Sequence, residues 1–285
     1  MTGEELHFDV DEGRRLAADA LGSPNDPPVV LLHGGGQTRH SWSETAQALA
    51  AAGWYAVSVD LRGHGESDWS PTGDYSPTRF ANDVTRLARA FDEPPVLVGA
   101  SLGGISSLLA VGTADTEARP LARALVLVDI ATQVEPDGAD RIVSFMESRP
   151  DGFASLQEAA DAVALYNPHR KPPRNLDGLA KNLRKHADGR YRWHWDPAFL
   201  KRRHFSADSL TDPMLLDRAA RGLTIPTLLV RGRLSDLLSQ EGAEAFLEQV
   251  PHAKFADVSG AGHMVAGDQN DLFADAVLGF LSAEL

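Results

Sequence analysis

Strand-like apolar runs alternate with segments of helical pattern along most of the chain. The runs are short and mostly continuous, which is typical of strands buried on both faces of a parallel sheet. They lie at residues 29–32, 55–60, 96–99, 124–129, 227–230 and 254–258. Between them, helices are predicted at residues 41–52, 76–91, 102–111 and 270–281. This alternation predicts an α/β fold with a doubly wound, mainly parallel sheet.

Two parts of the chain depart from this alternation. Residues 6–10 and 15–21 are predicted to open the sheet as an antiparallel pair. Between Thr132 and Leu223 the alternation stops, and helical periodicity continues between turn-forming residues. We therefore expect a core domain of residues 1–131 and 223–285, with an inserted helical cap over residues 132–222.

The sequence Gly99-Ala100-Ser101-Leu102-Gly103 directly follows an apolar run. A turn of this kind between a strand and a helix pushes the serine hydroxyl outward, provided that no flanking side chain collides with the neighbouring backbone. Glycine at both flanks meets this condition. Ser101 is thus a candidate nucleophile, although a turn that merely contains serine could have the same five residues.

A glycine-rich loop, His33-Gly34-Gly35-Gly36, directly follows the run at residues 29–32. Glycines in this place let backbone N–H groups converge on one point, as an oxyanion hole requires. We expect one N–H donor from Gly35, or alternatively Gly36, and a second from Leu102. A merely flexible glycine turn is the other interpretation. His33 is expected to brace the loop and is also a candidate for the substrate pocket.

An acidic residue and a histidine follow two late strand-like runs. Asp236 lies in the turn after residues 227–230, and His263 ends the glycine turn after residues 254–258. The resulting chain order is serine, aspartate, histidine, which differs from the orders in chymotrypsin and subtilisin. The predicted catalytic residues are therefore Ser101, Asp236 and His263.

Together these features resemble the α/β-hydrolase fold family, especially its bacterial esterase, haloperoxidase-like and epoxide-hydrolase-like branch. The turn at residues 60–67, Asp-Leu-Arg-Gly-His-Gly-Glu-Ser, is similar to a structural motif of that branch. Some members of the fold place the acid after an earlier strand, which makes Asp129 the alternative to Asp236. Epoxide hydrolases and haloalkane dehalogenases of this fold have aspartate where this chain has Ser101. The resemblance therefore implies acyl transfer rather than alkyl transfer.

The expected reaction is hydrolysis of a carboxylic ester or lactone of a small to medium organic molecule, through an acyl-enzyme and without a cofactor. The same three groups can also serve C–C bond hydrolysis, perhydrolysis or cyanohydrin cleavage, which remain alternatives. A binding protein without catalysis is disfavoured, because all three catalytic side chains are present. Ten histidines are scattered without the spacing of metal ligands, so no metal is expected.

Apolar and basic side chains are both concentrated in the predicted cap. Phe145, Met146, Tyr166, Trp193 and Trp195 could line an acyl or alcohol pocket, or could form the core of the cap. Residues 165–204, the basic segment, contain eleven Lys and Arg against three Asp, a net charge of +8. This segment either attracts anionic substrates or is a solvated face that complements an acidic neighbour.

Composition limits the location and the partners. The net charge of −13 favours solubility and argues against nucleic acid or an anionic membrane as partner. There is no cysteine, which excludes disulfides, thiolate metal sites and thiol catalysis. The first residues are acidic, and no apolar run is long enough to span a membrane. We expect a cytoplasmic enzyme, monomeric or homodimeric, that acts on a small-molecule substrate.

Overall fold

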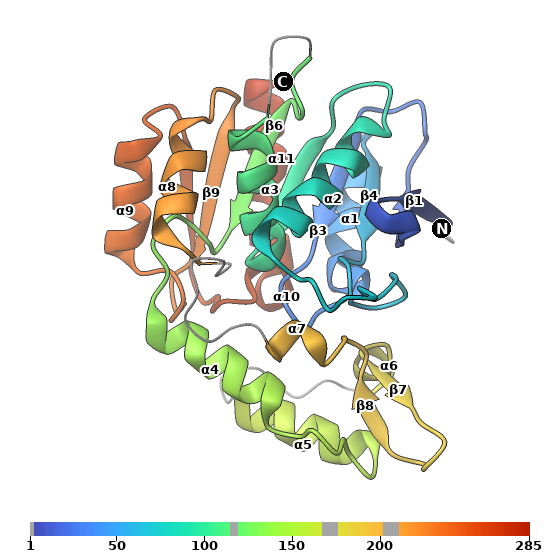
Figure 1. Ribbon diagram of the computed structural model, residues 1–285. Coiled ribbons are helices and arrows are strands. Elements are labelled where there is room, and N and C mark those ends of the chain that lie inside the picture. Colours follow the sequence, from blue (N-terminus) through green and yellow to red (C-terminus); the bar gives the residue numbers. More distant parts are fainter. Residues whose placement is uncertain (1–2, 115–118, 167–175, 202–210) are drawn as a thin grey trace.

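The centre of the molecule is a sheet of eight strands in the order β1-β2-β4-β3-β5-β6-β9-β10 (Figure 1). The structure, a computed structural model, describes residues 3–114, 119–166, 176–201 and 211–285. The strands are β1 (Glu4–Asp9), β2 (Arg15–Leu21), β3 (Pro28–Leu32), β4 (Tyr55–Val59), β5 (Val96–Ala100), β6 (Ala124–Val128), β9 (Thr227–Gly232) and β10 (Lys254–Val258). β2 is antiparallel to both of its neighbours, and all other pairs are parallel. The predicted fold class and antiparallel opening pair are confirmed.

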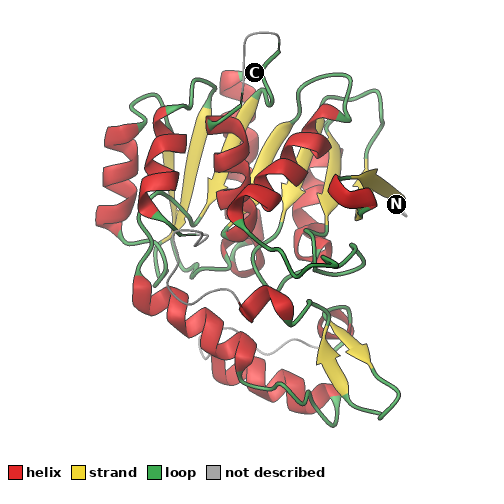
Figure 2. Cartoon of the chain, in the orientation of Figure 1, coloured by secondary structure: helices red, strands yellow, loops and turns green. Residues whose placement is uncertain are grey.

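Helices cover both faces of this sheet, so the molecule has three layers (Figure 2). One face carries α1 (Ser43–Ala51) and α11 (Asn270–Glu284). The other face carries α2 (Pro77–Arg89), α3 (Leu102–Gly112), α8 (Pro213–Arg221) and α9 (Gln240–Gln249). Three short helices lie in connections: η1 (Asp11–Gly13), η2 (Arg39–Trp42) and α10 (Val265–Asp268). This is the doubly wound arrangement that the alternation predicts.

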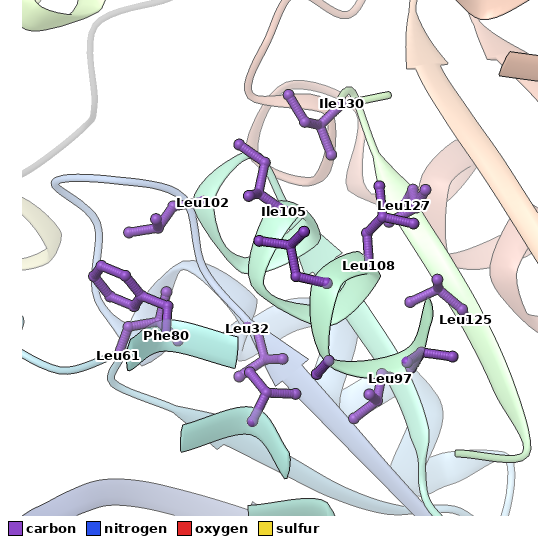
Figure 3. Packing of buried hydrophobic residues seen from close by; sticks show 14 of the residues in the cluster. Leu32, Leu61, Phe80, Leu97, Leu102, Ile105, Leu108, Leu125, Leu127 and Ile130 are labelled. Atoms are coloured by element: carbon purple, nitrogen blue, oxygen red, sulfur yellow. The ribbon is translucent and has the colours of Figure 1, made fainter. Parts of the chain in front are cut away.

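The central strands contribute to a separate core on each side of the sheet, because successive side chains point to opposite faces. In β3, Val29 packs with α1 and α11, whereas Val30 packs with the helices of the other face. Figure 3 shows Ile105 and Leu108 of α3 beside Leu127 of β6 in this second core. Full burial of such a side chain contributes roughly 1.5–3 kcal/mol. The two cores hold the strand ends in fixed positions.

The segment after β6 extends beyond the carboxyl ends of the parallel strands (Figure 1). We call its described elements from α4 to α7 the cap segment. They are α4 (Pro136–Glu147), α5 (Leu156–Tyr166), α6 (Asp177–Ala180), β7 (Leu183–Lys185), β8 (Tyr191–Trp193) and α7 (Ala198–Lys201). Phe153, Ala159 and Leu183 form a small core of their own within it. The functional loops of a parallel sheet lie at this edge, so the cap segment lies over the candidate site.

The region predicted as a helical cap differs from that expectation in two ways. It contains an antiparallel hairpin, β7–β8, whose connection includes Asp188-Gly189, a strong hairpin dipeptide that a search for helical periodicity overlooks. In addition, α8 packs on α3 in the core layer, with the backbones of Gly112 and Ala219 in close approach. The chain thus returns to the core layer before residue 222. The domain division itself stays a prediction.

Among the helices of the described ranges, none combines the length and the apolar character that crossing a membrane requires.

Candidate active site

Ser101 lies in the strained corner that the sequence predicts. β5 ends at Ala100 and α3 begins at Leu102, and the backbone of Ser101 between them has φ +45° and ψ −110°. A side chain at Gly99 would place its Cβ 2.5 Å from the carbonyl carbon of Gly103, and one at Gly103 would collide with the Leu32 carbonyl. A positive φ at a non-glycine residue is strained and is common at functional sites.

His263 is hydrogen-bonded to Asp129. Its Nδ1 donates to Asp129 Oδ2 over 2.7 Å, and the imidazole is 19% exposed whereas the carboxylate is fully buried. The end of β9 and the turn after it hold that carboxylate with two more donors: the Gly232 N–H at 2.9 Å and the Ser235 hydroxyl at 2.5 Å. A buried carboxylate requires such donors, because burial without them is costly. Asp129 itself has a positive φ of +52°.

The expectation that Asp236 orients His263 is therefore wrong in this structure. Asp236 pairs instead with Arg141 of α4, with 2.6 Å between carboxylate and guanidinium, and its side chain is 37% exposed. The physical reason is the shape of the turn after β9. Gly232 and Ser235 direct their donors at Asp129, whereas Asp236, the residue after Ser235, pairs with Arg141. The alternative residue, Asp129, is the carboxylate that binds His263.

Ser101 and Asp129, the carboxylate bound to His263, follow the neighbouring strands β5 and β6. The Ser101 N–H donates to the Val128 carbonyl over 3.2 Å, and Asp129 is the next residue. Within the described ranges, no hydrogen bond joins the Ser101 hydroxyl to His263. Catalytic hydrogen bonds are often long without substrate and tighten when it binds.

The glycine loop offers one free N–H group beside Ser101. A Cβ on Gly34 would lie 3.4 Å from Ser101 Cβ, so the loop runs along the serine. The N–H of Gly34 donates to Gln37 Oε1 at 2.9 Å, and that of Gly36 donates to His64 Nε2 at 3.1 Å. In the part of the chain that the structure describes, the N–H of Gly35 has no partner. Of the two predicted alternatives, Gly35 therefore fits an oxyanion donor and Gly36 does not.

Leu102 provides the other predicted N–H donor. It is the first residue of α3, and the first N–H groups of a helix have no partner within the helix. No other described group bonds to this N–H either. Its place directly after Ser101 and at the positive end of the helix dipole suits a developing oxyanion.

His33 braces the loop, as expected, and has no free polar atom for a substrate. The Leu61 N–H donates to His33 Nε2 at 3.0 Å, so the ring proton is on Nδ1, which donates to the Gly34 carbonyl at 2.8 Å. The ring is completely buried. Burial is the main reason why the pKa of His33 falls from 6.5 to about 4. The structure does not support the expectation of His33 in the substrate pocket.

Acid is expected to destabilise the fold as the pH falls below about 6.5. Between that value and pH 4 the unfolded chain binds a proton at His33 and the folded chain does not, so protonation favours unfolding. The stabilisation is complete above pH 6.5 and declines by about 3 kcal/mol toward pH 4. Urea titrations at several pH values measure the unfolding free energy and its decline.

His7 provides the matched control for this prediction, because its imidazole is 43% exposed. Because this side chain is exposed, the His7→Gln variant should leave the unfolding free energy at pH 7.5 unchanged. An unfolding free energy that stays constant from pH 7.5 to pH 5 would contradict the prediction.

Apolar residues of the cap segment cover the glycine loop. A Cβ on Gly36 would lie 3.1 Å from Met146 Cε and 3.2 Å from Trp195 Cζ3, and one on Gly35 would lie 3.8 Å from the Phe199 ring. Met146 and Trp195, both predicted pocket residues, are thus adjacent to the candidate oxyanion site.

The other predicted pocket residues in the cap segment, Phe145, Tyr166 and Trp193, form a cluster of aromatic rings with Trp195. Trp193 stacks on Trp195 with ring centroids 5.0 Å apart, and Phe145 stacks on Tyr166 at 4.3 Å. Phe145 also contacts Trp193, at 5.8 Å. Aromatic packing of this kind stiffens the cap segment and supports Met146 and Trp195, the two residues that lie next to the glycine loop.

The basic segment is only partly described. Arg170, Lys171, Arg174, Arg202 and Arg203 lie outside the described residues. All three arginines in the described part of this segment bind groups of the protein itself. Arg184 donates to the Gly65 carbonyl, Arg190 to the Gly152 carbonyl at 2.7 Å, and Arg192 pairs with Asp188 at 2.6 Å. These arginines have structural contacts, and steering of anionic substrates stays a prediction.

Three residues of the site were not found by sequence reasoning: Ser235, His64 and His194. The position of Ser235 beside Asp236 gives no sign that its hydroxyl binds Asp129. His64 lies in the 60–67 turn, whose resemblance to a structural motif does not indicate a contact with Gly36. Within the described ranges, no group of three or more His, Asp or Glu side chains could hold a metal ion.

Comparisons with known proteins find esterases among the relatives of this chain. The esterase Rv0045c of Mycobacterium tuberculosis is 28% identical over 263 residues, which cover 90% of this chain and 83% of the esterase. Protein phosphatase methylesterase 1 of Homo sapiens is 34% identical over 163 residues, 55% of this chain. The match covers only 42% of that methylesterase, so the chain spans less than half of its length.

A structural and a family comparison cover nearly the whole chain. The crystal structure of E-2-(acetamidomethylene)succinate hydrolase superposes with a TM-score of 0.83 at 23% identity, covering 98% of this chain and 99% of the hydrolase. That likeness bears on the fold alone. The family model described as "Alpha/beta hydrolase family" matches residues 29–276. The chain belongs to the alpha/beta hydrolase family.

Proposed function

We propose that Ser101, His263 and Asp129 form a catalytic triad that hydrolyses carboxylic esters or lactones of small to medium organic molecules. The observation that carries this proposal is the strained Ser101 corner beside the hydrogen-bonded His263–Asp129 pair. Family membership and the relatives named as esterases support hydrolysis of ester bonds. Acyl transfer is favoured because the nucleophile position holds serine.

In the first step, His263 acts as general base. Because its Nδ1–H donates to Asp129, Nε2 carries no proton and can accept the one from the Ser101 hydroxyl. The serine oxygen bonds to the ester carbonyl carbon, and the carbonyl oxygen becomes an oxyanion. The N–H groups of Gly35 and Leu102 stabilise this oxyanion by roughly 3–4 kcal/mol each, a value typical of such donors. Asp129 stabilises the imidazolium that results.

The tetrahedral intermediate then collapses. The bond from the carbonyl carbon to the alcohol oxygen breaks, and the imidazolium of His263 gives its proton to the leaving alkoxide. Water then takes the place of serine, loses its proton to His263 and attacks the acyl-enzyme. The second collapse releases the carboxylic acid and returns the proton to Ser101. Every proton that moves passes through one ring nitrogen, so the chain needs no further acid or base.

The cap segment is proposed to close the site over the acyl group. Met146, Trp195 and Phe199 present apolar atoms to the glycine loop, and apolar walls exclude water and favour apolar acyl chains. We further propose a cytoplasmic enzyme, active as a monomer or homodimer, that needs no nucleic acid or membrane. The net charge of −13 supports solubility.

Covalent labelling tests this function directly. The protein should hydrolyse p-nitrophenyl acetate and butyrate, and a serine-directed fluorophosphonate should abolish that activity at one label per chain. Peptide mass spectrometry should locate the adduct on Ser101. An adduct on another residue, or full activity after complete labelling, would contradict the triad. Absence of hydrolysis across a broad ester panel would refute the proposed substrate class.

A further inference from the structure

Three histidines bind three successive peptide groups of the glycine loop. The first peptide group contains the Gly34 carbonyl and the Gly35 N–H, and His33 binds its carbonyl at 2.8 Å. The second contains the Gly36 N–H, which donates to His64 Nε2 at 3.1 Å. The third contains the Gly36 carbonyl, which lies 3.3 Å from His194 Nε2. Each peptide plane therefore has its own imidazole.

The protonation of His194 follows from its partners. The Gly65 N–H donates to His194 Nδ1 at 2.6 Å, and a backbone amide can only donate. Nδ1 therefore carries no proton, and Nε2–H is the donor to the Gly36 carbonyl. His194 is 1% exposed. Burial and the neighbouring imidazoles of His64 and His33 hold the pKa of His194 well below its usual range, so the ring is neutral.

The loop needs such external constraints. Glycine has the widest backbone freedom of any residue, and Gly36 has a positive φ of +77°. Three consecutive glycines thus have little tendency of their own to aim the Gly35 N–H at one point. Donors of an oxyanion hole are effective only when their direction is fixed before the reaction. In this loop the direction is fixed by the three histidines, together with two hydrogen bonds between Gly34 and Gln37.

The three histidines differ in origin. His33 and His64 belong to the core, whereas His194 follows β8 in the cap segment. We propose that His194 is a positioning residue, through which the docked cap segment completes the alignment of the Gly35 oxyanion donor. This inference rests on the proposed function, because it concerns the oxyanion hole of that reaction. It goes further by making catalysis depend on one hydrogen bond from the cap segment.

A purely structural role for His194, as one contact among several that dock the cap segment, is the alternative. Other bonds serve that docking. The Asp196 N–H donates to the Gly63 carbonyl at 2.8 Å, and the Tyr75 hydroxyl donates to Asp196 Oδ2 at 2.6 Å. Neither bond reaches the glycine loop. Removing the Tyr75 hydroxyl therefore weakens docking without changing the contacts of Gly36, which makes Tyr75→Phe the matched control.

Two conservative variants separate the two hydrogen bonds of His194. In His194→Asn, the amide oxygen can replace Nδ1 as acceptor from Gly65, but no donor reaches Gly36. In His194→Gln, the longer side chain can place its N–H₂ group where Nε2–H stood. We expect His194→Asn to lower kcat at least about 10-fold with little change in KM, since loss of a full oxyanion donor costs about 10²–10³. His194→Gln should stay within about 3-fold of wild type.

Affinity for an oxyanion analogue separates the two roles, because a purely structural role of His194 would leave this affinity unchanged. An alkyl trifluoromethyl ketone adds to serine and places an oxyanion in the hole, so its Ki should rise in His194→Asn by the same factor as kcat/KM falls. Tyr75→Phe should leave both unchanged. Equal losses in His194→Asn and Tyr75→Phe, or a loss in His194→Gln as large as in His194→Asn, would overturn the proposal.

Amide hydrogen exchange keeps this test separate from the test of the proposed function. If wild type hydrolyses no ester, the proposed function fails, but the loop can still be examined. The Gly36 amide should exchange at least about 10-fold faster in His194→Asn than in wild type, because the loop opens more often. It should not exchange faster in Tyr75→Phe. An unchanged Gly36 rate in His194→Asn would show that His194 does not hold the loop.

Discussion

The Ser101→Ala variant is expected to lose about 10⁴- to 10⁶-fold in kcat while keeping its fold, since removal of a triad nucleophile costs this much in comparable hydrolases. The substitution removes only Oγ. It leaves Cβ in place, so the backbone at φ +45° is no more strained than before. Among the described residues the Ser101 hydroxyl has no hydrogen-bond partner, so no buried group is left unpaired. Steady-state hydrolysis of p-nitrophenyl butyrate measures the loss.

Ser107, in the helix α3 that follows Ser101, provides a matched control. Its hydroxyl is buried and donates to the Gly103 carbonyl over 2.8 Å, away from the reacting atoms of the proposed mechanism. Ser107→Ala should keep kcat within about 3-fold of wild type. Thermal unfolding of both variants checks the fold. If Ser101→Ala retains more than a few per cent of wild-type kcat, Ser101 is not the nucleophile.

The sequence contains strong local signals for the sheet and for the serine corner. Continuous apolar runs mark the central strands because both faces of those strands are buried. The corner is equally local, because Gly99 and Gly103 are required by contacts within a few residues and with the neighbouring strand β3. Features of this kind can be predicted because they depend on short-range steric contacts, which restrict the residue types at nearby positions in the sequence.

The acid could not be chosen in the same way. Asp129 and Asp236 each follow a buried strand, and either would give the order serine, aspartate, histidine. The choice depends on which carboxylate receives the donors of Gly232 and Ser235, residues more than a hundred positions from Asp129. Aspartate can adopt the positive φ found at Asp129, but the presence of aspartate in the sequence does not predict it. Long-range hydrogen bonds determine which carboxylate binds His263, and no local sequence pattern indicates such bonds.

The cap segment was hard to predict for a related reason. Helical periodicity is present in α4 and α5, but the hairpin strands β7 and β8 have only three residues each, too few for an alternating pattern to be recognised. His194 carries no local sign of its contact with Gly36, which is 158 residues away. A buried histidine among aromatic residues predicts core packing, and only the assembled structure reveals the loop that it contacts.

The Asp129→Asn variant is expected to lose about 10⁴-fold in kcat, the cost of placing the histidine in the wrong tautomer in a related triad. Asparagine has nearly the same shape, and its oxygen can still accept from the Gly232 N–H. Its amide N–H₂ then faces His263 and donates to Nδ1. The ring proton moves to Nε2, which can no longer accept the proton of Ser101. Loss of kcat with an intact fold is the expected result, measured with the same ester and by thermal unfolding.

Asp236→Asn is the matched control, because it makes the same chemical change at the residue that sequence reasoning favoured. Asp236 is partly exposed and pairs with Arg141, and such pairs contribute at most about 1 kcal/mol to stability. Its loss should change kcat less than about 3-fold, because His263 keeps its bond to Asp129. A larger loss in Asp236→Asn than in Asp129→Asn would mean that Asp236, and not Asp129, is the acid that orients His263 during turnover. The triad would then have to be reassigned to Ser101, His263 and Asp236.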